Sequence, residues 1–447
     1  MTYHVGQLLP LTIGEVANGG WCVARPPATS EADTGPVIFV RHALPGERVR
    51  ARITEVAARF ARADAVEVLS PSPDRVEPPC PVARPGGCGG CDWQHARLPA
   101  QRALKASVIA QQLRRLAGID RDVTVEPVPA GEPTEPGLGW RTRVQFAVRA
   151  DGVAGLRAHR SHEVIDVGEC LIAHPSITSL DVTRRRWPGA ESVEVLAGPA
   201  ERVVIVSGAV AAEDAVGVPA ESVLIRIRGD GPPGPPAIRG DGPPATRGRA
   251  GGLTPLRGRG YLTQHAAGRD WRVSAGAFWQ VHPGAADALA DAVLAALEPK
   301  PGDVALDLYC GAGLFGGVLA EAVGPDGVVI GVESNAPAVR DARHNLRDRA
   351  RIHRGDVSAV LRRGNLQVAR LVVADPPRAG LAREVIDYLA RPGAERFAYV
   401  SCDPATLARD IGLLLARGWE LADLRAFDAF PMTHHVECVA TLTRAPA

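Results

Sequence analysis

The feature that most constrains the fold is a strand that ends in a glycine turn, inside a long stretch of alternating strands and helices. From about residue 270 apolar strand-like runs alternate with helix-like segments, which is the pattern of a parallel doubly wound sheet. The run VALDLYCGAGLFG, residues 304–316, places Gly311 and Gly313 directly after a buried strand. Such glycines permit a tight bend and close approach of the backbone to a ligand. The sequence therefore predicts an α/β domain with a ligand at the carboxyl edge of its sheet.

Acidic residues follow the next three strands. The strand GVVIGVES ends at Glu333, where a carboxylate can hold ribose hydroxyls, and IHRGDV delivers Asp356 to a position suited to an adenine edge. A fourth strand ends at Asp375 in ADPPR. A dinucleotide-binding fold shares the glycine turn, but Leu314 crowds the turn and disfavours NAD. The order of these elements resembles the class I S-adenosylmethionine-dependent methyltransferases.

The fifth strand, in FAYVSCDPATLARD at residues 397–410, ends on a thiol. Asp403 is a good helix N-cap and Pro404 suits the first helical position, so a helix is expected from Ala405 onward. The positive end of a helix lowers the pKa of a nearby thiol. A small buried core residue is the alternative interpretation of Cys402. Because the strand end opens on the predicted ligand pocket, a nucleophile is favoured.

A carboxylate stands among apolar residues in the last predicted strand, HVECVATL. Burial of Glu437 is costly unless the carboxylate has a chemical task. Alternation places Glu437, Val439 and Thr441 on one face of the strand. Glu437 is therefore a candidate general base.

Five motifs in order, FWQVHPG at 278–284, DLYCGAG, DPPR, SCDPATLARD and MTHHVEC, resemble those of the RNA uracil-5-methyltransferases, and the resemblance covers nearly the whole chain. It implies that Cys402 is the nucleophile and Glu437 the base. The residues it implies for the S-adenosylmethionine site are Gln280, Tyr309, Glu333, Asp356 and Asp375, beside the turn at Gly311 and Gly313. This chain has Leu314 where related enzymes often have Asn, so one side-chain contact to the methyl donor is expected to be missing.

The chemistry of uracil calls for the same two groups. Carbon 5 of uracil is a weak nucleophile, and addition of a thiolate to carbon 6 converts the ring into an enolate that can attack a methyl group. A base must then remove the proton from carbon 5, and the target nucleotide must leave the RNA stack. An RNA cytosine-5 methyltransferase is one alternative. A non-catalytic RNA-binding protein that keeps the fold is another.

Residues 1–75 read as short alternating strands with glycine and proline turns, which predicts a small OB-like β-barrel. It resembles the TRAM domain found in many uracil-5-methyltransferases, which implies RNA binding. Arg48, Arg50 and Arg52 alternate along one strand and are expected on one face. That face is either simply solvated or directed at phosphates.

We expect two further units after the barrel. A central α/β domain spans residues 76–268, and the catalytic domain spans 269–447. The central unit contains a cysteine-rich loop at 76–95 and a flexible Gly, Pro and Arg-rich insertion at 229–260. A helix expected at 96–118 is amphipathic and is a candidate to pack on the catalytic domain.

Three cysteines occur close together in a loop too rich in Pro and Gly for regular structure, and a fourth lies far downstream. They are Cys80, Cys88, Cys91 and Cys170. Four thiolates suit either zinc or an iron–sulfur cluster, with His95 as an alternative ligand. Ribosomal-RNA members of the resembled family carry a [4Fe–4S] cluster on a similar set, which favours iron–sulfur, although their first spacing is usually two residues shorter. Cys22, Cys310 and Cys438 are assigned to packing.

The formal net charge of +1 gives no global field that would attract a polyanion. Among 51 basic residues only Lys105 and Lys300 are lysines, a bias typical of a GC-rich genome. The amino terminus lacks a basic region and a cleavage site, and no apolar run approaches membrane-spanning length. We therefore expect a cytoplasmic protein without a membrane partner, acting on 23S rRNA or tRNA. Neither the RNA nor the oligomeric state is indicated by the sequence.

Overall fold

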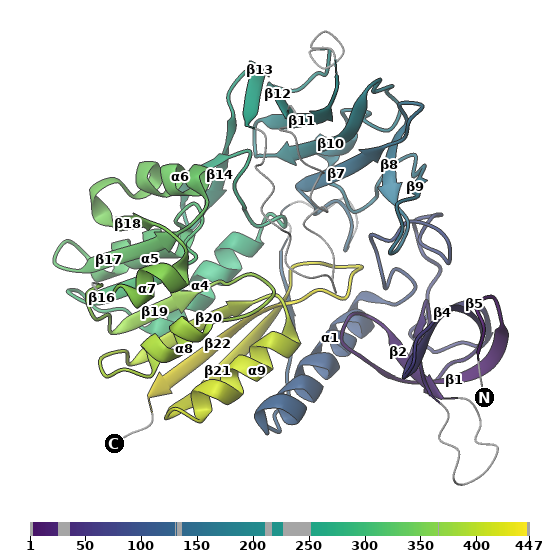
Figure 1. The fold of residues 1–447 in the computed structure, drawn as a ribbon, viewed down its shortest axis with the longest axis horizontal. Helices are drawn as coiled ribbons and strands as arrows, with labels where there is room; N and C mark the ends of the chain where they lie inside the picture. The colour runs from purple at the N-terminus through teal and green to yellow at the C-terminus, as the bar shows by residue number, and fades with distance from the viewer. Residues whose placement is uncertain are drawn as a thin grey trace.

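The computed structural model describes residues 3–25, 36–129, 131, 136–210, 217–226, 252–364 and 366–444. The amino-terminal strands close into a barrel, in the order β1-β2-β3-β5-β4 (Figure 1). Their bounds are Leu8–Val16, Cys22–Arg25, Val37–Arg41, Arg48–Val56 for β4 and Phe60–Ser70 for β5. Strand β4 alternates exposed arginines with apolar residues that fill the barrel. The arginines are Arg48, Arg50 and Arg52, which share the outer face as predicted.

A seven-stranded sheet follows, in the order β13-β12-β11-β10-β7-β8-β9. The strands are β7 (Arg143–Val148), β8 (Ala154–Arg157), β9 (Val164–Ile165), β10 (Ala190–Ala197), β11 (Arg202–Gly208), β12 (Ser222–Arg226) and β13 (Leu253–Arg257), with helix α2 at Pro175–Thr178. A hairpin of β14 (Tyr261–Ala266) and β15 (Arg269–Ser274) leads out of it. The sheet buries an apolar layer of its own, separate from that of the barrel.

The expected flexible insertion at 229–260 lies for the most part outside the described residues. Its carboxyl-terminal part is instead strand β13, which pairs antiparallel with β12 at the sheet edge. Leu253 and Leu256 pack against apolar clusters, which explains the ordered strand, and Pro255 is tolerated because an edge strand needs fewer ladder hydrogen bonds. The predicted insertion therefore extended too far.

The remaining chain forms an eight-stranded sheet in the order β18-β17-β16-β19-β20-β22-β21-β6, with helices on both faces (Figure 1). The strands are β16 (Val304–Leu308), β17 (Val328–Glu333), β18 (Arg351–Arg354), β19 (Leu371–Ala374), β20 (Arg396–Ser401), β21 (Trp419–Asp428) and β22 (Glu437–Arg444). The helices are α4 (Ala285–Leu297), α5 (Leu314–Val323), α6 (Ala336–Leu346), α7 (Val357–Arg362), α8 (Arg383–Leu389) and α9 (Pro404–Leu415). Strands β16 to β20 are parallel, so their carboxyl ends share one edge.

Two apolar cores lie on opposite faces of this sheet. Alternate strand residues supply both, since Ala398 and Val400 of β20 enter one core while Phe397 and Tyr399 enter the other. Helices α4, α5 and α6 cover the face of Ala398, and helices α7, α8 and α9 cover the opposite face. The near-continuous apolar strands follow from burial on both sides.

Two elements from earlier in the chain join this sheet. Helix α1 (Leu98–Gln112) ends in a π-helical turn at Leu113–Ala117, and Ile109 and Leu113 are buried in the core beneath α9. Strand β6 (Val125–Pro127) pairs parallel with β21 at the sheet edge. The amino-terminal third therefore contributes directly to the catalytic half of the molecule.

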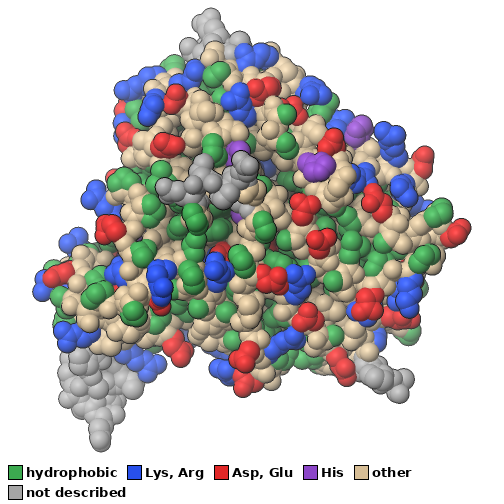
Figure 2. Space-filling model, turned by 180° about the vertical axis from the view of Figure 1, so that it is seen from behind, with side chains coloured by type: hydrophobic (Ala, Val, Ile, Leu, Met, Phe, Trp, Pro, Cys, Tyr) green, Lys and Arg blue, Asp and Glu red, His purple; other side chains and the backbone are tan. Residues whose placement is uncertain are grey.

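Charges of both signs are interspersed on the face drawn in Figure 2, in keeping with the small net charge. A helix able to cross a bilayer is not found among the described residues, because none there combines sufficient length with sufficient hydrophobicity.

Candidate active site

The sheet register brings Cys402 and Glu437 together. Strand β20 pairs antiparallel with β22, with Arg396 opposite Thr443 and Ser401 opposite Cys438. One step further in the same register puts Cys402 opposite Glu437. Directly opposed residues on neighbouring strands have Cβ atoms about 5 Å apart. The two predicted reactive residues therefore open on one site.

A capped helix fixes the position of the thiol. The Asp403 carboxylate accepts hydrogen bonds from the backbone N–H groups of Ala405, at 3.0 Å, and Thr406, at 2.8 Å. Pro404 occupies the first position of α9, as the sequence predicted. Cys402 is thus held between the last residue of β20 and the N-cap of α9, with little freedom to move.

The expected lowering of the Cys402 pKa by the helix terminus is wrong for this ligand-free state. Loss of water around the thiol, followed by the charge of Glu437, raises its pKa to about 12. Arg378 opposes this shift, but it is outweighed. The positive end of helix α9 does not by itself set the pKa of Cys402, because burial of the thiol outweighs it. The thiol is therefore protonated at neutral pH until ligands bind.

The groups that act on the thiol include two carboxyl groups and one guanidinium; they belong to Glu437, Asp375 and Arg378. Burial raises the pKa of Glu437 well above its usual range, the charge of Asp375 adds to that effect, and Arg378 opposes it. Burial also raises the pKa of Asp375 to about 7. Glu437 is only 5% exposed. A carboxyl group with a raised pKa stays protonated in the free state, and once ionised it is a stronger base than an ordinary carboxylate.

Arg378 is a residue whose role in this pocket the sequence did not reveal. It lies three residues after Asp375, at the end of the DPPR motif. Its effects on the pKa values of Cys402 and Glu437 depend on β19, β20 and β22 lying side by side. The only sequence signal was a charged residue following a strand end.

The glycine turn and the predicted acids lie along the shared carboxyl edge. Gly311 and Gly313 have φ values of 55° and 97°, and Tyr309 is held at 64°, a strained conformation for a tyrosine. A Cβ added at Gly311 would meet no atom within 4 Å, so the turn leaves room for a ligand. The Gly311 N–H donates to Glu333 Oε2 at 3.0 Å. The turn and the end of β17 are thereby joined.

The remaining residues predicted for the S-adenosylmethionine site lie in segments that connect a strand to a helix. Asp356 follows β18 and caps α7 by accepting from the Ala359 N–H at 3.1 Å. Gln280 is buried in the segment between β15 and α4. Leu314 begins α5 with its side chain in the apolar core. No polar contact from position 314 is therefore available to a ligand.

The four predicted ligand cysteines lie near one another. Electrostatic interactions link Cys170 to Cys88 and Cys91, and link Cys80 to Cys88 and Cys170. Burial raises the pKa of Cys88 to about 11. All four are free thiols. Their donor chemistry suits an iron–sulfur cluster or zinc, but no group of three or more His, Cys, Asp or Glu among the described residues is arranged to hold a metal ion. The other three expected packing thiols are buried; they are Cys22, Cys310 and Cys438.

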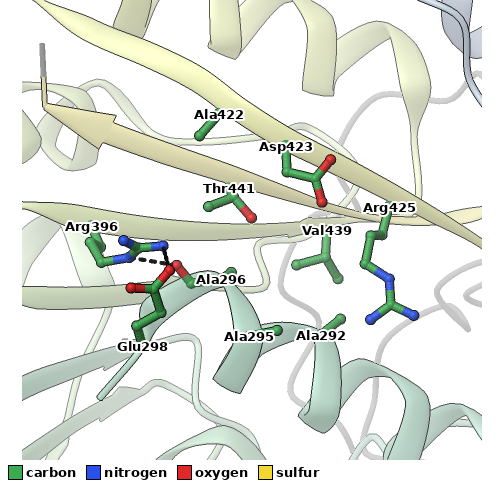
Figure 3. A pocket seen from close by; sticks show the side chains of 10 residues that line it. All are labelled: Ala292, Ala295, Ala296, Glu298, Arg396, Ala422, Asp423, Arg425, Val439 and Thr441. Carbon is green, nitrogen blue, oxygen red and sulfur yellow. Dashed lines mark hydrogen bonds and ion pairs between the residues drawn. The ribbon is translucent and has the colours of Figure 1, made fainter. Parts of the chain in front are cut away.

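A separate hollow of about 240 Å³ lies between α4 and the strands β21 and β22 (Figure 3). Val439 and Thr441 line it, on the strand face they share with Glu437, and the Arg396–Glu298 ion pair, at 2.7 Å, closes one side. Neither Cys402 nor Glu437 reaches it. This hollow is therefore distinct from the reactive pair.

Comparison with family models matches three parts of the chain. The model described as tRNA (Uracil-5-)-methyltransferase matches residues 360–445, and the TRAM domain model matches residues 4–66. The model for protein-L-isoaspartate(D-aspartate) O-methyltransferase matches residues 284–370. The first of these contains both Cys402 and Glu437.

Relatives match over nearly the full length. An uncharacterized RNA methyltransferase of Streptomyces avermitilis is 49% identical, over 99% of both chains. One of Bifidobacterium longum is 36% identical, over 97% of this chain and 96% of its own. Among solved structures, the Pyrococcus abyssi tRNA (uracil-54, C5)-methyltransferase in complex with S-adenosyl-L-homocysteine has a TM-score of 0.70 at 22% identity. That similarity covers 97% of this chain and 99% of the other.

The fold is that of the class I S-adenosylmethionine-dependent methyltransferases, preceded by a TRAM barrel. Together with the full-length relatives and the match over the strands that carry the reactive pair, it identifies the chain as an RNA methyltransferase. The chain belongs to the RNA uracil-5-methyltransferase family.

Proposed function

We propose that this enzyme transfers a methyl group from S-adenosylmethionine to carbon 5 of a uridine in RNA, through a covalent adduct with Cys402. The observation that supports the proposal is the register of β20 and β22, which ends with Ser401 opposite Cys438 and, continued by one residue, brings Cys402 opposite Glu437. A thiol and a carboxyl group in that arrangement are what addition and elimination at a pyrimidine require.

The reaction divides between these two side chains. The Cys402 thiolate adds to carbon 6 of the uracil, and the ring becomes an enolate whose carbon 5 takes up the methyl group as the sulfonium C–S bond breaks. Glu437, which is protonated in the free enzyme, must first release that proton to solvent. As a carboxylate it then accepts the proton from carbon 5, the ring double bond re-forms, and Cys402 leaves as a thiolate. Once Glu437 is ionised, its raised pKa makes it a stronger base for this transfer. Because the reactive pair is partly buried, the uridine must be flipped out of its stack to reach it.

S-adenosylmethionine supplies an electrophilic methyl group and a positive sulfonium. We assign its site to the carboxyl edge of the sheet, where Glu333 and Asp356 offer carboxylate oxygens and Gly311 leaves open backbone. The remaining assigned residues are Gln280, Tyr309, Gly313 and Asp375. A cation near Cys402 lowers the pKa of the thiol. Binding of the donor therefore favours the thiolate that the free enzyme lacks.

The experiment that tests this function compares three variants. Cys402→Ala abolishes both turnover and the covalent RNA adduct, while Glu437→Gln traps methylated RNA on the protein because the carbon 5 proton stays in place. Cys438→Ala is the matched control. Cys438 directly follows Glu437 in β22, but its side chain lies in the apolar core on the opposite face of the sheet. Methyl transfer by Cys402→Ala would overturn the proposal.

The substrate is a uridine in 23S rRNA or tRNA. The Pyrococcus abyssi enzyme acts on tRNA, by its name, and the TRAM barrel of this chain presents a row of exposed arginines. Nucleoside mass spectrometry of separated rRNA and tRNA, with and without the gene, identifies the substrate. Loss of 5-methylcytidine instead of 5-methyluridine would establish the cytosine alternative.

We also propose that Cys80, Cys88, Cys91 and Cys170 hold an iron–sulfur cluster. The proximity of the four thiols supports this, although their side chains are not closed into a ligand set in this structure. Iron and sulfide analysis of anaerobically purified protein tests it, with Cys88→Ser expected to lose both and Cys22→Ser to lose neither. Zinc in place of iron would contradict the proposal. The division into units at 1–75, 76–268 and 269–447 is likewise a proposal, which limited proteolysis tests.

A further inference from the structure

The loop between β21 and β22, residues 429–436, leads directly into Glu437. In Figure 1 it projects from the eight-stranded sheet toward α1 and the centre of the molecule. Its contacts come largely from the amino-terminal third of the chain. The placement of Glu437 therefore depends on residues far from it in sequence.

Helix α1 fixes the main chain of this loop. The Met432 N–H donates to Gln101 Oε1 at 2.7 Å, and the Lys105 ammonium donates to the Phe430 carbonyl at 3.0 Å. The backbone N–H groups of Asp92 and Trp93 both donate to the Met432 carbonyl at 3.0 Å. None of these hydrogen bonds uses the side chain of Asp92. The loop backbone at Phe430 and Met432 is thus held independently of that carboxylate.

The Asp92 carboxylate holds a different part of the loop, the ring of His434. Asp92 Oδ2 lies 2.6 Å from His434 Nδ1 and 3.3 Å from the His434 backbone N–H. Arg41 of the barrel pairs with the other carboxylate oxygen at 3.7 Å. Gly20 of the barrel lies so close that a Cβ there would be 2.8 Å from His434 Cβ. His434 is therefore enclosed by the barrel and the cysteine loop together.

From His434 the contacts continue to the reactive pair. Its ring centroid lies 4.0 Å from that of His435. Both ring nitrogens of His435 are 3.4 Å from Arg378 Nη2. Arg378 is the cation that acts on both Cys402 and Glu437. A series of contacts therefore runs from Asp92 to Arg378, and the charge of Arg378 acts on Cys402 and Glu437.

We propose that Asp92 and His434 are positioning residues, which hold His435 against Arg378 so that the guanidinium stays directed at Cys402 and Glu437. The inference rests on the proposed covalent mechanism and extends it, because it makes the barrel and the cysteine loop part of what orients the catalytic charge. Direct contact between Asp92 and RNA is disfavoured, since its side chain is only 11% exposed.

The test measures methyl transfer to RNA by Asp92→Asn, His434→Ala and His434→Asn. The first two lower kcat at least about tenfold, with KM for RNA and binding of S-adenosylmethionine unchanged, because misplacement of a catalytic group costs rate rather than affinity. His434→Asn recovers most of the rate, since its amide can donate to Asp92. The double variant Asp92→Asn/His434→Ala is no slower than either single variant if the pair acts as a unit.

His265→Ala is the matched control. That histidine pairs with Asp270 at 3.0 Å on the exposed β14–β15 hairpin, away from the loop, and its loss leaves kcat unchanged. Each variant is checked for an unaltered melting temperature and metal content, since Asp92 adjoins Cys91. Wild-type kcat in both Asp92→Asn and His434→Ala would overturn the proposal. A rise in KM with kcat unchanged would also overturn it, in favour of an RNA contact.

A second readout separates this inference from the proposed function. Alkylation of Cys402 by iodoacetamide requires neither RNA nor methyl transfer, and it reports the thiolate that Arg378 favours. We expect alkylation to be slower in Asp92→Asn and His434→Ala, to about the extent seen in Arg378→Met. If wild-type enzyme failed to methylate any RNA while these alkylation differences held, the function would fall and the positioning role would stand. Wild-type alkylation in both variants would refute the positioning role.

Discussion

At the scale of single residues, the two reactive side chains are both protonated in the free enzyme for the same reason. Burial disfavours the charged form of the Cys402 thiol and of the Glu437 carboxyl, and the pKa of each is raised. The site therefore avoids placing two buried negative charges side by side. In the proposed mechanism, the thiolate therefore forms when a positive ligand adds to the effect of Arg378.

The ionisation of Cys402 can be tested by its rate of alkylation in the free enzyme. With a pKa of about 12, the thiolate fraction rises about tenfold per pH unit below that value. We expect the alkylation rate, followed by mass spectrometry of the Cys402 peptide, to rise about a hundredfold between about pH 7 and about pH 9. A plateau within that range would show that the thiol ionises near neutral pH.

Asp307, at the end of β16, predicts a pH dependence of stability. Burial raises its pKa to about 8, so between about pH 4 and about pH 8 the folded chain holds a proton that the unfolded chain has released. Raising the pH through that window therefore favours unfolding. Asp307→Asn removes this contribution, so its melting temperature should exceed that of the wild type by a margin that grows toward about pH 8. A margin independent of pH would contradict this origin.

At this scale the sequence predicted that Cys402 and Glu437 lie near each other but not their electrostatics. The two residues were singled out because each sits where a small or apolar residue would suffice, at a strand end or in a buried strand. Arg378, His434 and Asp92 gave no comparable signal, since an exposed-looking polar residue in a loop has many uses. Their relation depends on contacts between distant segments, which spacing along one chain does not encode.

At the scale of elements, the N-cap of helix α9 also fixes the position of Cys402, the proposed nucleophile. Asp403→Ala removes the acceptor for two backbone N–H groups and should lower the free energy of unfolding by about 1 kcal/mol. We expect kcat to fall as well, because the residue before the cap is Cys402. Asp403→Asn caps almost equally well and should restore both, measured by urea denaturation and single-turnover kinetics. A loss of stability without loss of rate would show that the cap does not position the thiol.

The strands and helices around the site followed the sequence because their apolar patterns and turns are local. The strand ends at Glu333, Ala374 and Ser401 lie where apolar runs give way to polar residues. Strand β6 was missed, since a three-residue strand is recognised only by the edge of β21 that it covers. Strand β13 was missed because its two leucines were diluted by Gly, Pro and Arg in the same window.

At the scale of the whole molecule, a buried ion pair joins α1 to the catalytic sheet. Lys105 and Asp428 are 0% and 2% exposed and lie in hydrogen-bonding contact. Lys105→Met leaves the Asp428 carboxylate buried without its cation and should cost about 3–5 kcal/mol of unfolding free energy. Lys105→Met/Asp428→Leu should be less destabilised than the single variant. Chemical denaturation measures both.

The exposed pair Arg114–Asp120 provides the control for this prediction. Its side chains are 63% and 80% exposed, so Arg114→Met should have little effect on the free energy of unfolding. Equal effects of Lys105→Met and Arg114→Met would show that burial of the Lys105–Asp428 pair has no energetic consequence.

The hydrogen bonds that hold the loop before Glu437 also bear on how the enzyme is made. Gln101 and Met432 are 331 positions apart, and Asp92 and His434 are 342 apart. A ribosome releases the amino-terminal partner long before the carboxyl-terminal one, so Gln101 and Lys105 form these contacts only after the loop before Glu437 has been made. Closing such distant contacts is slow and comes late in folding. A growing or prematurely terminated chain that already carries the TRAM barrel and α1 therefore still lacks Glu437, and we expect it to be unable to methylate RNA.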